Sequence, residues 1–382
     1  MKKLNFVTVI QTRAMLFLTV LALTGGCTFS ETKPQASGKA GTITLMTWNL
    51  NNLFDGVEDG TEYDEYRKSA GWSEEKYRGR LNTIKDAISR IEPKPDLIVF
   101  QEVENLTILD DIAGSLSGFA WSHFANNPEA ALGIGIISRL PLTEARVHSI
   151  TIQTDTTPRP VLEVRVQTVK GESAEQTEPE QTDIVVFACH WKSKLGEASV
   201  TENNRKSSAR VILRRIRELW ETEPELGVII TGDLNENYDE FYRQNGDVIS
   251  ALLPDDPYCA QITGCSTADG EADAEMQKDF LVLSRNKPPV PVNFPQGTVV
   301  LFSPWMKELE NGSYFYKHAW ETIDHFLVSR QFFNMSALEY ERTVIVNIQP
   351  FTNYSGIPVS YNPKTGLGLS DHLPLLLVLK LL

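Results

Sequence analysis

Polar residues suited to metal and phosphate chemistry stand directly after several apolar, β-branched runs of the chain. Asn49 follows ITLMTW, Glu102 follows DLIVFQ and Asp233 follows VIITG. Two histidines are placed in the same way, because His190 ends the run IVVFAC and His372 precedes LPLLLVL. A strand that ends on such a residue projects it at the edge of a rigid sheet, where α/β enzymes place their chemistry. We therefore expect these residues to share one site.

The residue types in this set indicate a particular reaction. Glu, Asp and Asn side chains supply the hard oxygen ligands that Mg²⁺ or Mn²⁺ prefers, and His exchanges protons near neutral pH. Hydrolysis of a phosphodiester needs such a metal, a base for the attacking water and stabilisation of charge at phosphorus. The sequence lacks the C-x-x-C and Cys/His spacings of thiolate zinc sites. The residue types of this set fit these needs.

Short apolar strands alternating with a few amphipathic helices must position these residues. Runs bounded by turn residues predict the following strands: Ile43–Trp48, Leu97–Gln101, Gly135–Ile137, Leu162–Gln167, Ile184–Ala188, Val228–Thr231, Thr322–Ser329 and Leu375–Leu379. Apolar residues at helical spacing predict helices over Tyr77–Ile91 and Asn203–Trp220. No repeat or low-complexity linker follows residue 42, so we expect one domain over residues 42–382 of the α/β class.

The N-terminus has the features of an export signal. Lys2, Lys3 and Arg13 precede the apolar stretch Ala14–Leu23, which is too short to span a bilayer comfortably. Gly25 and Gly26 directly before Cys27 resemble the processing site of a bacterial lipoprotein. We therefore expect a signal peptide over residues 1–26, a lipid on Cys27 that anchors the protein in the bacterial cell envelope, and a flexible tether over residues 27–41. The alternative is a plain signal peptide and a secreted or periplasmic protein.

The net charge and the cysteines of the chain limit the ligands and the covalent bonds that we expect. The net charge of −14 means that any contact with nucleic acid must come from a local positive patch or a bound metal. Lys192, two residues after His190, is a candidate for such local charge, and the alternative is a solvated turn. Cys259 and Cys265 could close a small disulfide ring in an oxidising compartment. Cys189 stands in an apolar run and is expected to be a buried thiol.

The ordered set of motifs resembles the endonuclease/exonuclease/phosphatase family, from about Thr42 to the C-terminus. The resemblance rests on these residues in this order: Asn49, Glu102, His190, Asp233 with Asn235 in Gly-Asp-x-Asn, Asp324, and Asp371 with His372 in Ser-Asp-His. Each motif is short and is weak evidence by itself. The resemblance is specific because all of the motifs occur in this order within one domain. The resemblance implies a four-layer α/β sandwich, in which two packed mixed β-sheets are flanked by helices.

The resemblance also implies a role for each matched residue. Glu102 and Asp371 are expected to bind the metal, and Asn51 stands where some members carry an Asp ligand. Asn49 is expected to bind phosphate, and Lys192 could add positive charge beside it. The implied catalytic residues are His190, Asp233, Asn235, Asp324 and His372. In this set Asp233 orients or deprotonates water, Asp324 fixes the tautomer of a histidine, and His372 contacts or protonates the phosphate.

The motifs define the chemistry and leave the substrate open. Nucleic acid is the leading prediction, and a sphingomyelinase-like or other lipid or small-molecule phosphodiesterase is the alternative. Tyr316 and Trp320, in the stretch GSYFYKHAW, could stack a base or pack in the core. A prediction of another class is a non-catalytic surface binding lipoprotein. Against it, every main catalytic position is filled by the expected residue type.

Two further expectations concern ions and partners. The acidic loop Asp55–Glu65 lacks the spacing of an EF-hand, and a weak structural Ca²⁺ site remains an open alternative to a solvated loop. Nothing in the sequence indicates a protein partner, and we expect a monomer. DNA or RNA, endo- or exo-action, and the role of the Pro-rich segment Gly246–Pro304 are not decided by the sequence.

Overall fold

The computed structural model describes residues 11–12, 41–152, 158–169, 181–195, 198–256, 259, 261 and 277–382. Most of the predicted leader at residues 1–26 and of the tether at residues 27–41 lies outside these residues, and so do Cys27 and Cys265. The predicted lipid anchor and the Cys259–Cys265 bond therefore stay predictions. Among the described residues, no helix combines the length and the apolar character that crossing a membrane requires.

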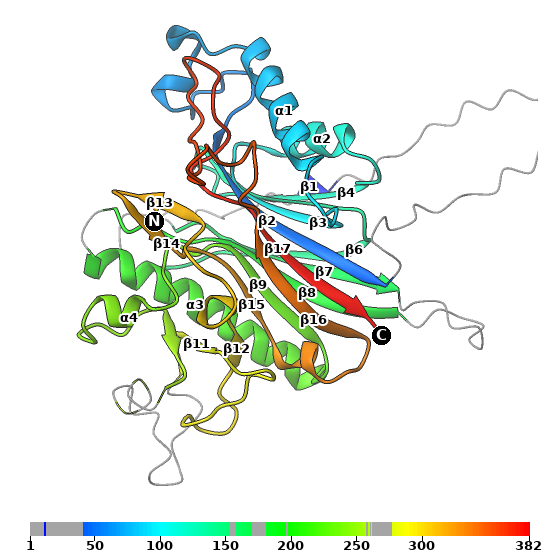
Figure 1. Ribbon diagram of the computed structural model, residues 1–382, viewed down its shortest axis with the longest axis vertical. Coiled ribbons are helices and arrows are strands. Elements are labelled where there is room, and N and C mark those ends of the chain that lie inside the picture. Colours follow the sequence, from blue (N-terminus) through cyan, green and yellow to red (C-terminus); the bar gives the residue numbers. More distant parts are fainter. Residues whose placement is uncertain are drawn as a thin grey trace, which may run out of the picture.

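Two mixed sheets form the centre of the described structure (Figure 1). The first has the order β1-β4-β5-β3-β2-β17-β16. Its strands are β1 (Gln11–Thr12), β2 (Thr42–Leu53), β3 (Leu97–Val103), β4 (Trp121–Ala125), β5 (Gly133–Ser138), β16 (Leu338–Ile345) and β17 (Leu375–Leu381). In Figure 1, β2 and β17 run side by side, so the first and last long strands are neighbours.

The second sheet has the order β10-β11-β12-β15-β9-β8-β7-β6. Its strands are β6 (Leu142–His148), β7 (Val161–Val169), β8 (Gln181–His190), β9 (Gly227–Asp233), β10 (Leu252–Pro254), β11 (Leu281–Ser284), β12 (Val300–Phe302) and β15 (Asp324–Val328). A separate hairpin consists of β13 (Tyr314–Tyr316) and β14 (Ala319–Glu321).

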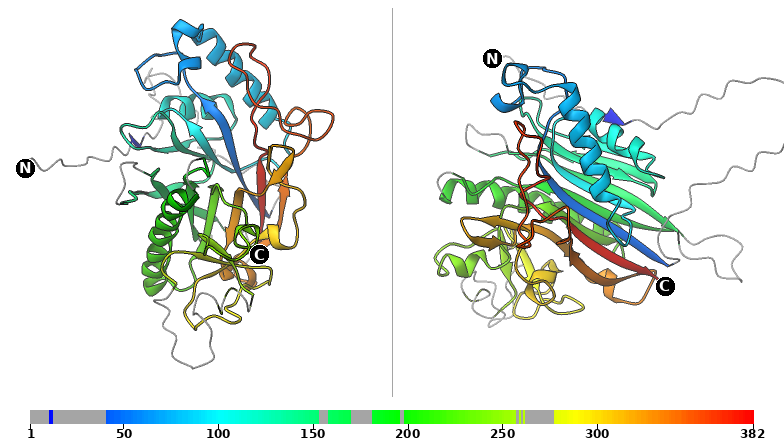
Figure 2. Two further views of the ribbon diagram at one scale, coloured as in Figure 1. Left: turned by 90° about the vertical axis from the view of Figure 1, so that its left-hand side faces the viewer. Right: turned by 45° about the horizontal axis from the view of Figure 1, so that its top comes forward.

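Helices cover the outer faces of both sheets (Figure 2). The α-helices are α1 (Glu74–Ile88), α2 (Leu106–Ser115), α3 (Ala198–Thr222) and the short α4 (Glu240–Arg243). Helices α1 and α2 pack in one core cluster with alternate residues of β2 and β3, such as Trp48 and Phe100. Helix α3 packs on β8 and β9 through residues such as Phe187 and Ile230. The predicted four-layer sandwich is confirmed.

The continuous apolar runs of the central strands follow from this layering. In β2, Leu45 faces the core between the sheets, and Met46 faces the α1–α2 layer. In β8, Val186 faces the core between the sheets, and Val185 faces α3. A strand buried on both faces needs apolar residues at every position, so its sequence shows no alternation. The polar residue at the end of each run therefore marks the point where the strand leaves the core.

The predicted strands and helices are all present, with shifted ends. The helix predicted over Tyr77–Ile91 runs from Glu74 to Ile88, and the N-cap Ser73 accepts a hydrogen bond from Lys76 N at 3.4 Å. The helix predicted over Asn203–Trp220 extends over Ala198–Thr222. Cys189 is a buried free thiol, as predicted.

Candidate active site

The carboxyl ends of four strands bring the predicted residues together between the two sheets. Parallel pairing of β2 with β3 sets Asn49 opposite Gln101, and parallel pairing of β8 with β9 sets His190 opposite Asp233. Parallel strands end at the same edge of a sheet, so each pair presents its polar residues on one side. Asn49 Nδ2 then donates a hydrogen bond of 3.0 Å to Asp233 Oδ2. This bond joins the two sheets, and the site belongs to both.

The backbone leaves regular strand geometry at Glu102. This residue has a φ of 61°, and the pairing of β3 with β5 is irregular between Gln101 and Val103. A bulge with a left-handed residue redirects a side chain at a strand end. Glu102 Oε1 accepts from Asn49 Nδ2 at 3.2 Å, and Oε2 accepts from Asn52 N at 2.9 Å. The carboxylate is held within the site while its side chain stays 19% exposed.

A glycine allows His190 and Asp233 to lie next to each other. Gly232 has a φ of 129°, and a Cβ atom there would lie 2.0 Å from the backbone oxygen of Cys189 on the neighbouring strand. No L side chain fits such a close approach. The Gly of Gly-Asp-x-Asn is therefore required by the packing of β8 against β9 beside the site.

His372 is oriented by a buried carboxylate. Its Nδ1 lies 2.8 Å from Asp324 Oδ2, and that same oxygen accepts a 2.6 Å hydrogen bond from Ser313 Oγ. Burial would lower the pKa of His372, but Asp324, Asp233 and Asp371 together raise the pKa to about 10. The imidazole is thus cationic near neutral pH, with Nε2 3.9 Å from Asp233 Oδ2.

Asp233 and His190 have the opposite electrostatic character. Burial and the nearby charge of Asp324 raise the pKa of Asp233 to about 7, although His372 and two hydrogen-bond donors act against this. Burial, Arg159 and His372 hold the pKa of His190 well below its usual range, so this imidazole is neutral. His190 Nε2 lies 3.6 Å from Asp233 Oδ2 and 3.8 Å from Glu102 Oε1. A neutral and a cationic histidine therefore flank one carboxyl group that titrates near pH 7.

Comparison with known proteins identifies the family. Residues 44–252 match the model of the Endonuclease/Exonuclease/phosphatase family. The chain belongs to the endonuclease/exonuclease/phosphatase family. It is accordingly a metal-dependent hydrolase of phosphodiester bonds. No curated protein sequence matches the chain.

Several solved structures match the chain at low sequence identity. D. rerio TDP2 complexed with single strand DNA product is 12% identical, with 89% of this chain and 99% of that chain covered and a TM-score of 0.48. An endonuclease/exonuclease/phosphatase family protein from Bacteroides thetaiotaomicron is 15% identical, with 90% and 96% covered and a TM-score of 0.45. A family member from Bacteroides vulgatus is 13% identical, with 89% and 99% covered and a TM-score of 0.47.

The donor set of the site fits the divalent metal of this family. Asp233, Asp324 and His372 present ligand atoms within 4.8 Å of one another, but Asp324 and His372 hydrogen-bond each other. Of the carboxylates predicted for the site, Glu102 and Asp371 are partly exposed. They offer the hard oxygens that Mg²⁺ and Mn²⁺ prefer. Burial, and after it the charge of Asp324, raise the pKa of Asp233, and a bound dication would act against both effects.

The remaining predicted residues lie around this centre with different contacts. Asn235 donates its backbone N–H to Asp233 Oδ1 at 2.9 Å and its side-chain Nδ2 to the Trp191 carbonyl at 3.1 Å. The Asn51 amide oxygen accepts from Tyr361 N at 3.0 Å, so its role as a metal ligand stays a prediction. Lys192 is half-buried, and its backbone carbonyl accepts from Arg205 at 3.1 Å.

Two arginines of the site are absent from the sequence prediction. Arg159 donates to the Trp191 carbonyl at 3.3 Å, and its charge acts on both His190 and Tyr63. It precedes β7, and the available signal was an arginine between two prolines directly before an apolar strand. Arg80, on α1, donates to the carbonyls of residues 50, 51 and 52. The available signal was its spacing, three residues after Tyr77 and four before Ile84, which places it on the buried face of α1.

A second acidic group lies in the loop for which a Ca²⁺ site was considered. Asp59, Glu62 and Glu104 present ligand atoms within 4.8 Å of one another. Burial raises the pKa of Glu104 to about 8, and the neighbouring carboxylates Asp55, Asp59 and Glu62 add to this shift. Glu62 and Glu104 already accept backbone hydrogen bonds from Gly60 and Asp55. Binding of Ca²⁺ there stays a prediction.

Proposed function

We propose that this phosphodiesterase is a nuclease. The observation that carries the proposal is a pair of tyrosine rings beside His372. Tyr314 stacks on His372 with centroids 4.6 Å apart and planes 27° from parallel, and Tyr316, which stacks on Tyr314, is 43% exposed. The charge of Glu102 also reaches Tyr63, where it adds to the rise in pKa that burial causes. Aromatic rings beside a phosphodiester site favour a substrate that carries bases over one that carries acyl chains.

The site residues divide the work of hydrolysis in this proposal. Asp233, with a pKa of about 7, accepts the proton of the attacking water. Cationic His372, held by Asp324, donates a hydrogen bond to a phosphoryl oxygen or a proton to the leaving oxygen. Neutral His190 and the amide of Asn49, which lie near the same oxygen of Asp233, orient the phosphate. No covalent enzyme intermediate is needed for in-line attack of water.

Charge on the phosphate is balanced by the metal and by nearby cations. Mg²⁺ or Mn²⁺ bound by Glu102 and Asp371 would act as a Lewis acid on the phosphoryl oxygens. Arg159, whose charge acts on His190, and Lys192, two residues after His190 in the chain, are the cations that we assign to this role. This local positive character allows a protein with a net charge of −14 to bind a polyanion.

Action outside the cytoplasm is also part of the proposal and rests on the sequence alone. The charged residues Lys2, Lys3 and Arg13, the apolar stretch Ala14–Leu23 and the small residues before Cys27 support export and lipid anchoring. Expression of the full chain and of Cys27→Ser, followed by membrane fractionation, tests the anchor. Membrane association that is unchanged by Cys27→Ser would contradict it.

The nuclease proposal is tested with a substrate panel. The purified protein is offered single-stranded DNA, duplex DNA, RNA and sphingomyelin, each with Mg²⁺, Mn²⁺, Ca²⁺ or EDTA. Cleavage of nucleic acid that EDTA abolishes is the expected result. Cleavage of sphingomyelin without cleavage of nucleic acid would replace the nuclease with a lipid phosphodiesterase. Binding without hydrolysis of any substrate would favour a non-catalytic binding protein.

A further inference from the structure

A row of three stacked rings leads from the catalytic centre to the surface. We name it the aromatic row, and it consists of His372, Tyr314 and Tyr316. Tyr314 lies between the other two, with ring centroids 4.6 Å from His372 and 5.9 Å from Tyr316. The planes of the two tyrosines are 14° apart. Exposure rises along the row, from 6% at His372 to 43% at Tyr316. The row therefore ends on a ring that is open to solvent.

The hairpin of β13 and β14 fixes the position of this outer ring. Its turn residues Lys317 and His318 have φ values of 46° and 67°, as in the tight two-residue turns that match strand twist. The pairing sets Tyr314 opposite Glu321, and the Glu321 carboxylate is bound by Asn237 and by Lys194. The hairpin is thus tied to the loops that follow β8 and β9, beside the site. A ring on such a support loses little entropy when a ligand stacks on it.

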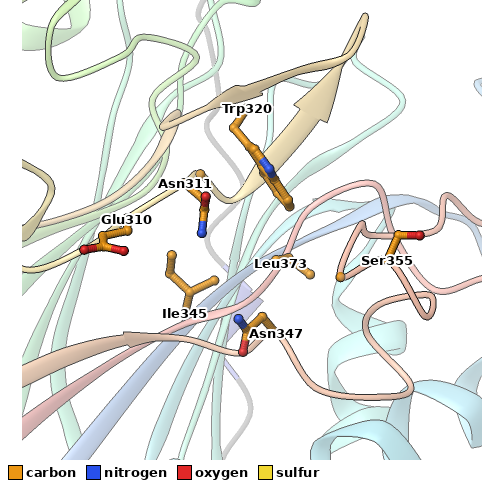
Figure 3. A pocket seen from close by; sticks show the side chains of 9 residues that line it. Glu310, Asn311, Trp320, Ile345, Asn347, Ser355 and Leu373 are labelled. Carbon is orange, nitrogen blue, oxygen red and sulfur yellow. The ribbon is translucent and has the colours of Figure 1, made fainter.

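The two faces of the hairpin serve different surroundings. Side chains alternate along a strand, so Tyr314 and Tyr316 share one face, and Phe315 and its partner Trp320 share the other. Figure 3 shows Trp320 directed into a separate pocket beside Asn311 and Leu373. Of the two aromatic residues considered for base stacking, Tyr316 belongs to the row that reaches His372, and Trp320 does not.

A planar group of the substrate can extend the row beyond Tyr316. The ammonium of the exposed residue Lys317 lies over the Tyr316 ring, 5.0 Å from its centre. A base that stacks there displaces this ammonium to the side, where it can meet a phosphate. A ring with an adjacent cation, close to a phosphodiester site, matches a nucleotide with its base and its next phosphate. In a duplex the bases already stack on each other, and exposing one costs a few kcal/mol before it can reach such a ring.

We propose that Tyr316 is a stacking platform for an unpaired base beside the scissile phosphate, so that the enzyme prefers single-stranded nucleic acid. The inference rests on the proposed nuclease function. The platform acts on substrate binding, because Tyr316 is separated from His372 by the ring of Tyr314. It therefore determines specificity and takes no part in proton transfer.

The test compares kcat and KM of the full protein with Mn²⁺ on three forms of one DNA sequence. These are the single strand, the duplex, and a single strand in which the nucleotides around the cleavage point carry no base. The variants are Tyr316→Ala, Tyr316→Phe, which keeps the ring, and the control Tyr354→Ala on a fully exposed tyrosine. The wild type should cleave the single strand most efficiently. Tyr316→Ala should raise KM for it about tenfold, with kcat retained, and should remove the preference over the base-free strand.

The outcomes separate this inference from the proposed function. Tyr316→Phe should keep KM within about threefold of the wild type, since the stacking surface remains. Equal effects of Tyr316→Ala on the normal and base-free strands, or equal cleavage of duplex and single strand by the wild type, would overturn the platform while the nuclease stands. Cleavage of sphingomyelin with no cleavage of any DNA form or of RNA would overturn both.

Discussion

His372 Nδ1 and Asp324 Oδ2 lie 2.8 Å apart, although the two residues are 48 positions apart in the chain. Asp324 begins β15 in one sheet, and His372 precedes β17 in the other, so the contact forms only when the sheets pack. It fixes which imidazole nitrogen faces the carboxylate and leaves Nε2 directed toward Asp233. Formation of the fold therefore sets both the orientation and the charge of this histidine.

Replacing Asp324 by Asn should remove the charge that keeps His372 protonated. We expect kcat for phosphodiester hydrolysis to fall by about 10²–10⁴-fold, with a melting temperature close to that of the wild type, because the side chain keeps its shape. Steady-state kinetics with Mn²⁺ and thermal unfolding measure the two effects. Asp86→Asn, on the exposed face of α1, is the matched control. Retention of more than half of the wild-type kcat by Asp324→Asn would show that the pair is structural.

Glu102→Gln should weaken metal binding, and this effect can be measured without an activity assay. A ligand that binds only the folded state raises the melting temperature, so Mn²⁺ should stabilise the wild type against EDTA. We expect this increase to be lost in Glu102→Gln and kept in Glu144→Gln, which changes an exposed glutamate on the edge strand β6. Differential scanning calorimetry at several Mn²⁺ concentrations measures it. Equal Mn²⁺ stabilisation of both variants would exclude Glu102 as a ligand.

Arg80 should be essential for the end of β2, where the backbone N–H of Asn52 binds the Glu102 carboxylate. Its guanidinium donates to the carbonyls of Leu50, Asn51 and Asn52 and lies 3.8 Å from the centre of the Tyr361 ring. Arg80→Met leaves these carbonyls without their donor, and we expect a loss of about 3 kcal/mol or more in the free energy of unfolding. Urea unfolding measures this loss, with exposed Arg90→Met as control. A loss below about 1 kcal/mol would show that water replaces the guanidinium.

Much of this architecture could be predicted because the central strands are buried on both faces. Their uninterrupted apolar runs mark both the strand and the polar residue that ends it, as at Asn49 and His190. The short strands β10, β11 and β12 were not predicted, since three or four apolar residues in a Pro-rich segment have no measurable period. Helix α2 was also not predicted, although Asn105 before LTILDDIA is a recognisable N-cap signal.

The site was predictable in its composition and not in its charge states. Residue types and order marked Glu102, but the φ of 61° that turns its carboxylate into the site is set by packing and by Asn52. Both His190 and His372 stand next to an apolar strand in the sequence, and nothing there distinguishes them. In the structure their pKa values are shifted in opposite directions. Burial and Arg159 act on the first, and Asp324 acts on the second. Such differences depend on neighbours that are distant in sequence, as with Arg159.

The free energy of unfolding should depend on Glu240 in acid solution. Glu240 Oε2 lies 2.9 Å from Lys194 Nζ and accepts from Asn237 Nδ2 at 2.9 Å. Burial would raise the pKa of this carboxyl, but Lys194, Gln244 and Asn237 lower it to about 2, from an ordinary value of 4.5. A depressed pKa in the folded state contributes stability that is fully present above pH 4.5 and is lost as the pH falls toward 2.

Glu240→Gln should therefore cost on the order of 1–3 kcal/mol at pH 7 and progressively less below pH 4.5, because the unfolded wild-type chain takes up a proton there while the folded carboxyl, with its pKa of about 2, stays ionised. Urea unfolding of both proteins between pH 3 and 7 measures the difference. Glu129→Gln, on an exposed glutamate, should show a small difference that is constant with pH. If the cost of Glu240→Gln is the same at pH 3 and pH 7, then the contribution of Glu240 lies in packing and neutral hydrogen bonds. The ion pair with Lys194, which ties the loop after His190 to α4, would then contribute nothing to folding.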